Sequence, residues 1–356
     1  MTFILGRDRD DGPKGHLGHY RARDGSQGAP IYVDVDDPHA ALVVGKRGYG
    51  KSHTLGVFAE ALARAAGVAP VVVDPMGVFS SMAEAAPDPA HGRVPAEIVS
   101  EPAVSPDAVD PRSWCALVGL SPDSGAGALL WQAAASASSL SGMRAHVAAA
   151  DAPDTVTRAA GNHLRLAASW DVFDPEGLDA SELATSAATV VDLSEMERAP
   201  ANAVLRAVAE ELYAARAREQ IDRLPWLLVD EAHVFFDGVA ADALRAILTR
   251  GRGHGVSLVA ATQRPGAIPA VGRSQSDLIV AHRLTAQSDI DALEALQPTY
   301  VDGRLLERLP TDPGDVVVLD DTTETVHAAR VRTRHSLHDG DSPRASEVVA
   351  SAPTHL

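Results

Sequence analysis

Two patterns of apolar and polar residues alternate along most of the chain. Short apolar or alternating runs, bounded by Gly, Pro or charged residues, are typical of strands, and they occur at 31–35, 40–44, 70–75, 188–194, 226–233, 256–263 and 277–283. Helical spacing of apolar residues follows at 52–66, 201–219 and 241–250. Alternating strands and helices predict an α/β fold with a mainly parallel sheet. The first two strands are expected to be joined by the turn "DDPH".

The segment 81–185 breaks this alternation. Its two long amphipathic stretches, "GALLWQAAASASSLSGMRAHVAAA" and "TVTRAAGNHLRLAASW", follow one another without an apolar run of strand type. We therefore expect a helical insertion at 81–185 within a core formed by 38–80 and 186–340. The polar, Gly-rich residues 1–37 are expected to form an arm or irregular strands. Residues 316–319 and 326–331 predict a C-terminal β-hairpin, and 341–356 a flexible tail.

The net charge of the chain bears on which partners it can bind and on the salt concentration in which it works. There are 48 acidic against 31 basic residues, a net charge of −17. Such acidity argues against nucleic acid as a partner, because phosphates repel it. Dispersed Asp and only three lysines favour the other explanation, a halophilic protein whose acidic surface is adapted to high salt.

Cysteine usage and hydropathy indicate a cytoplasmic protein. The single cysteine, Cys115, excludes an intramolecular disulfide, and no Cys/His cluster has the spacing of a zinc site. No stretch approaches the roughly 18 apolar residues of a membrane span. We therefore expect neither export nor membrane insertion.

The stretch "GKRGYGKSHT" at 45–54 matches G-x-x-x-x-G-K-[ST], and it lies between a predicted buried strand and an amphipathic helix. Glycines let the backbone N–H groups point at phosphates. Lys51 would contact the β- and γ-phosphates of ATP, and Ser52 would bind Mg²⁺. The residues expected to contact the nucleotide are Gly45, Gly48, Tyr49, Gly50, Lys51, Ser52 and His53, although the His53 imidazole could equally be a surface or packing group.

The stretch "WLLVDEAH" supplies the second half of this candidate site. Its apolar residues predict a buried strand that ends in Asp230 and Glu231, at the edge of the sheet where ligands of parallel α/β proteins bind. Asp230 would hold Mg²⁺, and Glu231 would be the general base for the attacking water. Adjacent acids at a strand end are otherwise often only solvated.

Two further segments carry candidate polar groups. Gln263 ends the next strand in "VAATQRP" and could orient the attacking water, or it could cap the turn before Pro265. Arg250 and Arg252 lie in the glycine-rich "ILTRGRGHG". Either could reach the γ-phosphate in a neighbouring subunit, as could Arg283, or they could be ordinary surface arginines.

These motifs, in this order, resemble the HerA-type ATPases, relatives of the FtsK DNA pumps. The resemblance covers 38–80 and 186–340, and "RGRGHGVSLVAATQRP" is its most specific part. It implies a RecA-like core, hexameric rings, and ATP-driven movement of double-stranded DNA, often beside a partner nuclease. By this resemblance, the motif roles carry over to Lys51, Ser52, Asp230, Glu231 and Gln263. The resemblance also implies that Arg252 is the arginine finger, which acts on the nucleotide of a neighbouring subunit.

The chain departs from this family in three respects. Val78 replaces an acid of the family's turn after the second strand. The segment before the phosphate loop is too short for the family's N-terminal β-barrel, so docking to a nuclease through such a barrel is not expected. The block 81–185 has no counterpart in the resemblance.

The sequence therefore predicts an ATP-hydrolysing ring motor that translocates or remodels double-stranded DNA. The basic elements available to a DNA channel are "RGRG" at 250–253 and "VRTRH" at 331–335. The alternative is a nucleotide-gated scaffold or regulatory ATPase that recruits a protein through the helical insertion without pumping DNA. A small-molecule kinase is a third reading, disfavoured because no separate acceptor site is visible.

Overall fold

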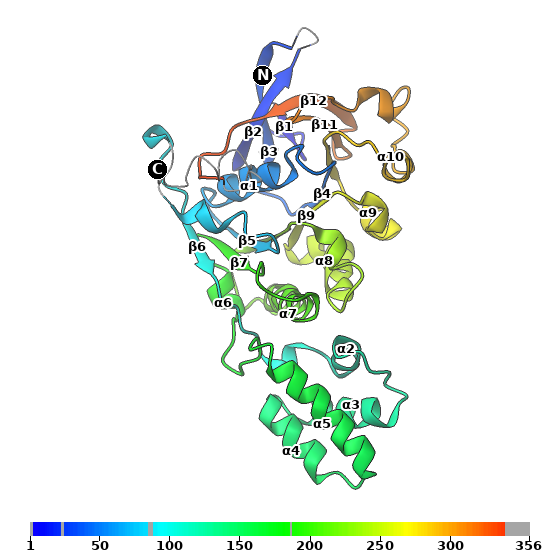
Figure 1. Cartoon of the computed structure of the whole chain (residues 1–356). Helices are drawn as coiled ribbons and strands as arrows, with labels where there is room; N and C mark the ends of the chain where they lie inside the picture. The colour runs from blue at the N-terminus through cyan, green and yellow to red at the C-terminus, as the bar shows by residue number, and fades with distance from the viewer. Residues whose placement is uncertain (1–2, 23–24, 85–87, 186, 339–356) are drawn as a thin grey trace, which may run out of the picture.

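The computed structural model describes residues 3–22, 25–84, 88–185 and 187–338. Within these ranges, twelve strands form one sheet, in the order β1-β3-β2-β12-β11-β10-β4-β9-β8-β5-β7-β6, with helices packed against it (Figure 1). The predicted α/β class with a mainly parallel sheet and a C-terminal hairpin is confirmed. The predicted tail, 341–356, lies outside the described residues.

One half of the sheet is parallel throughout. It consists of β4 (Ala40–Val44), β5 (Val68–Asp74), β6 (Ala96–Val99), β7 (Ala188–Asp192), β8 (Leu224–Val229), β9 (Ser257–Thr262) and β10 (Leu278–Ala281). Its central strands are buried along their whole length, because helices cover both of their faces. Continuous apolar runs in the sequence are the consequence.

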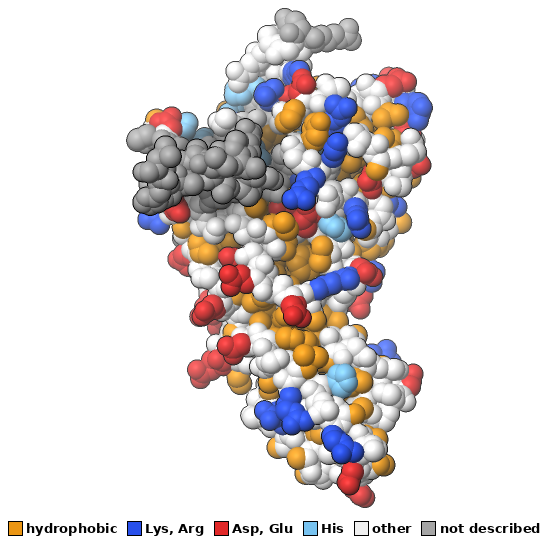
Figure 2. All heavy atoms as spheres, viewed as in Figure 1, with side chains coloured by type: hydrophobic (Ala, Val, Ile, Leu, Met, Phe, Trp, Pro, Cys, Tyr) orange, Lys and Arg blue, Asp and Glu red, His pale blue; other side chains and the backbone are white. Residues whose placement is uncertain are grey.

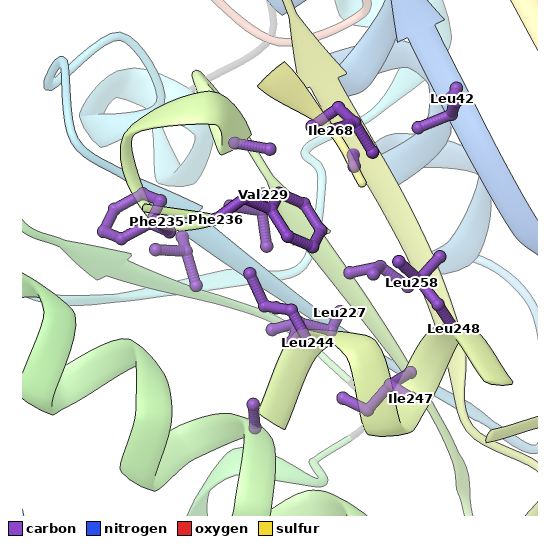
Figure 3. Close-up of a cluster of buried hydrophobic side chains, with 14 of the residues drawn as sticks. Leu42, Leu227, Val229, Phe235, Phe236, Leu244, Ile247, Leu248, Leu258 and Ile268 are labelled. Carbon is purple, nitrogen blue, oxygen red and sulfur yellow. The ribbon is translucent and has the colours of Figure 1, made fainter. Parts of the chain in front are cut away.

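Two hydrophobic clusters lie on opposite faces of the parallel half of the sheet. Leu42 and Val44 of β4 pack with α7 (Arg198–Ala217) and α8 (Ala241–His254), in the cluster that Figure 3 shows. The alternate residues Ala41 and Val43 pack with α1 (Lys51–Leu62). Successive side chains of a strand point to opposite faces, so β4 contributes to both clusters and holds the loop after it between them.

The other half of the sheet is mostly antiparallel. β11 (Asp315–Asp320) pairs with β10 and β12 (Thr325–Val331), and β12 pairs with β2 (Lys14–Arg21). β2 pairs in turn with β3 (Gln27–Asp34), and β1 (Phe3–Leu5) completes this edge in parallel with β3. β3 and β4 follow one another across the expected turn at 36–39, yet four strands separate them in the sheet. The turn therefore does not join neighbouring strands.

Four helices between β6 and β7 form a group of their own, which Figure 1 shows at the end of the molecule opposite the N-terminal strands. They are α2 (Pro111–Leu117), α3 (Gly125–Ser136), α4 (Leu140–Ala149) and α5 (Asp154–Ala168). Side chains of Asp110, Ser124 and Ser139 accept hydrogen bonds at the starts of α2, α3 and α4, which explains where these helices begin. Trp114 and Leu130 lie at the centre of a separate hydrophobic cluster.

The expectation that 81–185 contains no strand was wrong. β6 pairs in parallel with β7 at the edge of the sheet, and α6 (Ala180–Leu183) leads back into β7. β6 has a neighbour on one side, and its residues are half-buried or exposed. An edge strand of this kind lacks the continuous apolar run by which the buried strands were identified.

The segment after β12 is fixed to α1 by a buried carboxylate, Glu60. Its oxygens accept hydrogen bonds from Arg332 Nη1 at 2.7 Å and from the backbone N–H groups of His335 and Ser336 at 2.9 and 2.8 Å. Burial alone would raise the pKa of Glu60, but Arg332 and these N–H groups hold it below its usual value.

This contact corrects one prediction about DNA binding. The side chains of Arg332 and Arg334 are 8% and 2% exposed and lie within 4 Å of Glu60. The segment "VRTRH" therefore carries two of its charges inside the protein, where they neutralise Glu60 and stabilise the C-terminal segment. It is not the exposed basic element that was expected.

Two short helices, α9 (Ala270–Ser274) and α10 (Gln287–Glu294), complete the fold beside β10. No helix in the described ranges is both long enough and apolar enough to cross a membrane.

Candidate active site

The polar residues singled out in the sequence meet at the carboxyl edge of the parallel strands. The phosphate loop follows β4, Asp230 and Glu231 follow β8, and Gln263 follows β9. An open pocket of about 480 Å³ lies at this edge. Of the seven residues expected to contact ATP, five line it: Gly48, Gly50, Lys51, Ser52 and His53. Glu231 lines the same pocket, so the fold brings the two halves of the predicted site together.

Gly45 and Tyr49, also expected to contact the nucleotide, do not line this pocket. A Cβ on Gly45 would lie 2.5 Å from Cβ of His282, so the glycine lets the loop pass over β10. The Tyr49 ring faces two cations, Lys46 Nζ at 5.8 Å and the Arg283 guanidinium at 5.7 Å. Both residues shape the loop rather than the pocket wall.

The backbone of the loop has the conformation that its glycines permit. Gly48 and Gly50 have φ angles of +80° and +105°, in the region that side chains other than glycine rarely adopt. Gly50 is the N-cap of α1, which begins at Lys51. The free N–H groups and positive dipole end of α1 therefore face the pocket, an arrangement that favours a bound phosphate.

Lys51 and Asp230 form a buried polar centre. Lys51 is 5% exposed, and burial lowers its pKa although Glu231 and Asp230 oppose the shift. Asp230 is fully buried, and burial raises its pKa to about 6 although the Ser52 hydroxyl and the Glu231 N–H act in the opposite direction. Burying charged groups is costly unless other groups compensate them. A bound phosphate and cation would supply that compensation.

The oxygen atoms at this centre fit a magnesium ion. Asp230 Oδ1 accepts the backbone N–H of Glu231 at 2.8 Å, but buried Oδ2 has no hydrogen-bond partner in the described part of the chain. The Ser52 hydroxyl interacts with the same carboxyl group. Carboxylate and hydroxyl oxygens are the hard ligands that Mg²⁺ prefers, and the unpaired Oδ2 leaves one of them available.

Glu231 is held in a strained and specific position. Its φ of 44° and ψ of 40° place it in the left-handed region, which is costly for a residue other than glycine and recurs at functional sites. Phe235 and Phe236 follow it into the core and anchor the turn (Figure 3). Burial alone would raise the pKa of Glu231, but His233 and Lys51 hold it below its usual value. The side chain is therefore an ionised carboxylate at neutral pH, as a general base must be.

Two histidines of the site had no role in the sequence interpretation. His233 Nδ1 lies 3.2 Å from Glu231 Oε2 and 3.3 Å from Thr262 Oγ1, and so links the ends of β8 and β9. His282 Nε2 lies 2.9 Å from Thr54 Oγ1 beneath the phosphate loop, and burial lowers its pKa to about 3, so it is neutral. A polar residue at the end of an apolar run was the available signal in both cases.

A second open pocket, of about 350 Å³, adjoins the first. Its polar part consists of Arg47, Arg198, Glu231, His233 and Gln263, and the exposed Met76 and other apolar residues form the rest. Glu231 and Arg47 line both pockets. Gln263 lines this adjoining pocket and not the pocket that His53 lines.

The two arginines of "RGRG" lie at the other edge of the sheet. The helix predicted at 241–250 is longer than expected: α8 continues through the glycine-rich segment to His254 and ends at Gly255 with a φ of +78°. Gly251 fits there because a Cβ would lie 2.5 Å from Val256 O. Arg252 forms an ion pair of 3.1 Å with Asp277, directly before β10, and the Arg250 guanidinium lies over the Tyr213 ring. Neither residue lies beside the phosphate loop of its own chain.

The half-exposed side chain of Arg252 contacts a buried charge cluster at this amino edge. His39 Nδ1 lies 2.7 Å from Asp277 Oδ2, and His39 Nε2 lies 3.2 Å from Asp34 Oδ2. Arg7 Nη1 pairs with Asp34 at 2.7 Å. The cluster ties β1 and β3 to β4, β10 and α8.

This cluster predicts a loss of stability at alkaline pH. Burial would lower the pKa of His39, but Asp277 and Asp34 raise it to about 9. The resulting stabilisation is complete below the unfolded-state pKa near 6.5 and is lost as pH rises toward about 9. We expect the free energy of unfolding to fall by on the order of 2 kcal/mol between those values, and to fall less in His39→Gln. Urea titrations across this pH range test it, with His146→Gln as control. An unchanged slope in His39→Gln would contradict the assignment.

Comparison with known proteins gives a structural likeness. No protein-family model and no curated protein sequence matches the chain. VirB4 of Thermoanaerobacter pseudethanolicus superposes with a TM-score of 0.66 at 18% identity, over 92% of this chain and 98% of VirB4. The bacterial conjugative coupling protein TrwB gives 0.59 at 15% identity, over 95% and 92%. TrwB in complex with ADP and Mg²⁺ gives 0.58 at 16% identity, over 93% and 98%. At these identities the likeness concerns the fold alone, and the chain has the RecA-like α/β fold of P-loop proteins.

Proposed function

We propose that this chain binds ATP with Mg²⁺ and hydrolyses it. The observation that carries the proposal is that Lys51 and Glu231 line one pocket, while Asp230 is buried within the field of Lys51 and its Oδ2 is unpaired within the described residues. Buried ionisable groups whose pKa values are shifted toward the neutral form, as those of Lys51 and Asp230 are, cluster at functional sites. The likeness to TrwB, which has been seen with ADP and Mg²⁺, supports the same ligands.

Each side chain has a distinct part in the proposed reaction. Backbone N–H groups of the phosphate loop and Lys51 bind the phosphates of ATP, and Ser52 and Asp230 hold Mg²⁺. When bound, Mg²⁺ supplies positive charge to the phosphate oxygens. Glu231 accepts a proton from the attacking water, and Gln263 orients that water from the adjoining pocket. His233 positions Glu231 through their 3.2 Å contact.

We further propose that the chain works as a homo-oligomeric ring motor of HerA type on double-stranded DNA. The motif order supports this, and so does the fold it shares with TrwB, described as a conjugative coupling protein. In a ring, Arg252 or Arg250 would act on the nucleotide of the neighbouring subunit, since each lies away from its own phosphate loop. A hexamer, a partner nuclease and a cytoplasmic location are part of the same proposal.

The acidic surface fits a motor that works in high salt. Figure 2 shows Asp and Glu side chains spread over the viewed face rather than gathered in one patch. Dispersed charge of one sign remains hydrated and is screened within about 3 Å at molar ionic strength. We propose that the protein is halophilic and that such screening reduces repulsion between its surface and DNA.

Steady-state ATP hydrolysis in molar KCl, with and without linear duplex DNA, tests the proposed function. We expect hydrolysis that DNA stimulates severalfold, because a translocating motor couples turnover to its track. A Glu231→Gln preparation is the blank for contaminating ATPases. Hydrolysis indifferent to DNA would contradict the motor and favour the nucleotide-gated scaffold. Absence of both ATP binding and hydrolysis would contradict the ATPase itself.

A further inference from the structure

We propose that Arg47 contacts the γ-phosphate of ATP bound to its own chain and stabilises the charge that develops there during hydrolysis. The inference rests on the proposed ATPase function and adds an arginine to its site. Arg47 is the third residue of the phosphate loop, where the motif itself specifies no residue type.

The position of Arg47 is the first argument. Its side chain is exposed, and it lines both the nucleotide pocket and the adjoining pocket that contains Gln263. Glu231 also lines both. Arg47 and Glu231 therefore flank the place where the two pockets meet.

The expected position of the γ-phosphate follows from the two residues that must serve it. Lys51 binds the β- and γ-phosphates from the buried end of the pocket, and Glu231 activates the water that attacks the γ-phosphate. The γ-phosphate must therefore lie between Lys51 and Glu231. A guanidinium beside Glu231 at the same junction faces that phosphate, whereas the α-phosphate and base would extend toward His53 and Val331 in the other part of the nucleotide pocket.

The charge of Arg47 is available for such a contact. Within the described residues, no ion pair and no hydrogen bond involves its guanidinium. Its field reaches both partners of the reaction, since it helps to lower the pKa of Glu231 and of Lys51. By contrast, Arg198 lines the adjoining pocket but is paired with Asp237 at 2.8 Å.

The other arginine candidates, Arg250, Arg252 and Arg283, line neither of the two pockets. Arg252 is paired with Asp277 at the opposite edge of the sheet, and Arg250 lies over Tyr213. Arg283 donates to Thr311 O and faces Tyr49. An arginine supplied in cis stabilises transition-state charge as well as one supplied by a neighbour, provided that it reaches the phosphate. Arg47 meets this condition in a single subunit.

Arg47→Ala and Arg47→Lys test the proposal. A γ-phosphate contact predicts that Arg47→Ala lowers ATP affinity about tenfold and leaves ADP affinity within about twofold, since a charge-assisted hydrogen bond is lost with ATP alone. We expect kcat to fall about 10²-fold or more. Arg47→Lys should restore part of the ATP affinity and part of kcat, because lysine keeps the positive charge but lacks the planar set of guanidinium N–H donors. Titration calorimetry gives the two affinities, and steady-state assays give kcat.

Arg198→Ala is the matched control, because it removes a paired arginine from the same adjoining pocket, and it should change the ratio of ATP to ADP affinity by less than about twofold. If the wild-type chain hydrolyses ATP and Arg47→Ala leaves this ratio and kcat unchanged, the role of Arg47 is overturned while the ATPase proposal stands. An equal loss of ATP and ADP affinity also overturns it. If the wild-type chain binds neither nucleotide, the proposed function fails, and the inference with it.

Discussion

Replacing Glu231 by glutamine is expected to lower kcat for ATP hydrolysis by about 10²- to 10⁴-fold, the usual contribution of a general base. The amide has nearly the same shape as the carboxylate, but it cannot accept a proton from water. ATP affinity should stay within about threefold of the wild type, because in the proposed site the loop and Lys51, rather than Glu231, bind the phosphates. The variant should therefore trap ATP.

Two measurements separate the chemical step from binding. Single-turnover hydrolysis reports the loss of the base, and calorimetry with ATP reports the affinity. Glu195→Gln is the control, since it makes the same chemical change at an exposed position. Turnover by Glu231→Gln at the wild-type rate would exclude the residue as the base. Loss of ATP binding would instead show that the negative charge helps to hold Lys51.

Replacing Lys51 by alanine or methionine is expected to abolish ATP binding and turnover. Lys51 is a buried residue of the pocket proposed to hold ATP, and in that proposal its removal leaves the β- and γ-phosphates without their main charged partner. Wild-type protein at an ATP concentration of 100 times Kd should gain about 2.7 kcal/mol of stability. The variants should gain almost none of it.

The Lys51 variants should remain folded without nucleotide, so a loss of stabilisation by ATP can be attributed to lost binding. Burial lowers the pKa of Lys51 despite the nearby acids, so the charged form is unfavourable in the empty pocket and its removal should not lower the free energy of unfolding. Lys51→Met also keeps most of the packing of the aliphatic stem. Thermal unfolding with and without ATP, beside the control Lys14→Ala, measures both effects. A full stabilisation by ATP in Lys51→Met would remove the lysine from the site.

The parallel core and the two halves of the candidate site could be predicted because their signals are local. The phosphate loop is a contiguous motif between a buried strand and an amphipathic helix, and Asp230 and Glu231 follow directly after an apolar run. In a parallel sheet, all carboxyl ends of the strands lie at one edge. Sequence order alone therefore indicated that these residues meet.

Two features of the fold, strand β6 and the last turn of α8, were not predicted, and each has a physical reason. β6 has a neighbouring strand on one side and does not show the buried pattern. The helix predicted at 241–250 ends before Gly251 and Gly253, yet α8 continues through them to His254, and Gly251 packs closely against Val256. The intrinsic cost of glycine in a helix is about 1 kcal/mol, which tertiary packing can exceed.

The sequence by itself determined the class of the fold, the phosphate loop and the acidic pair, because each depends on residues close together in the chain. Only the tertiary structure placed His282 beneath the phosphate loop, Arg332 against Glu60, and Arg47 at the junction of two pockets beside Glu231. It also separated Arg252 from its own phosphate loop. These relations join residues that are up to hundreds of positions apart, and packing of strands and helices, rather than any local pattern, decides which of them come into contact.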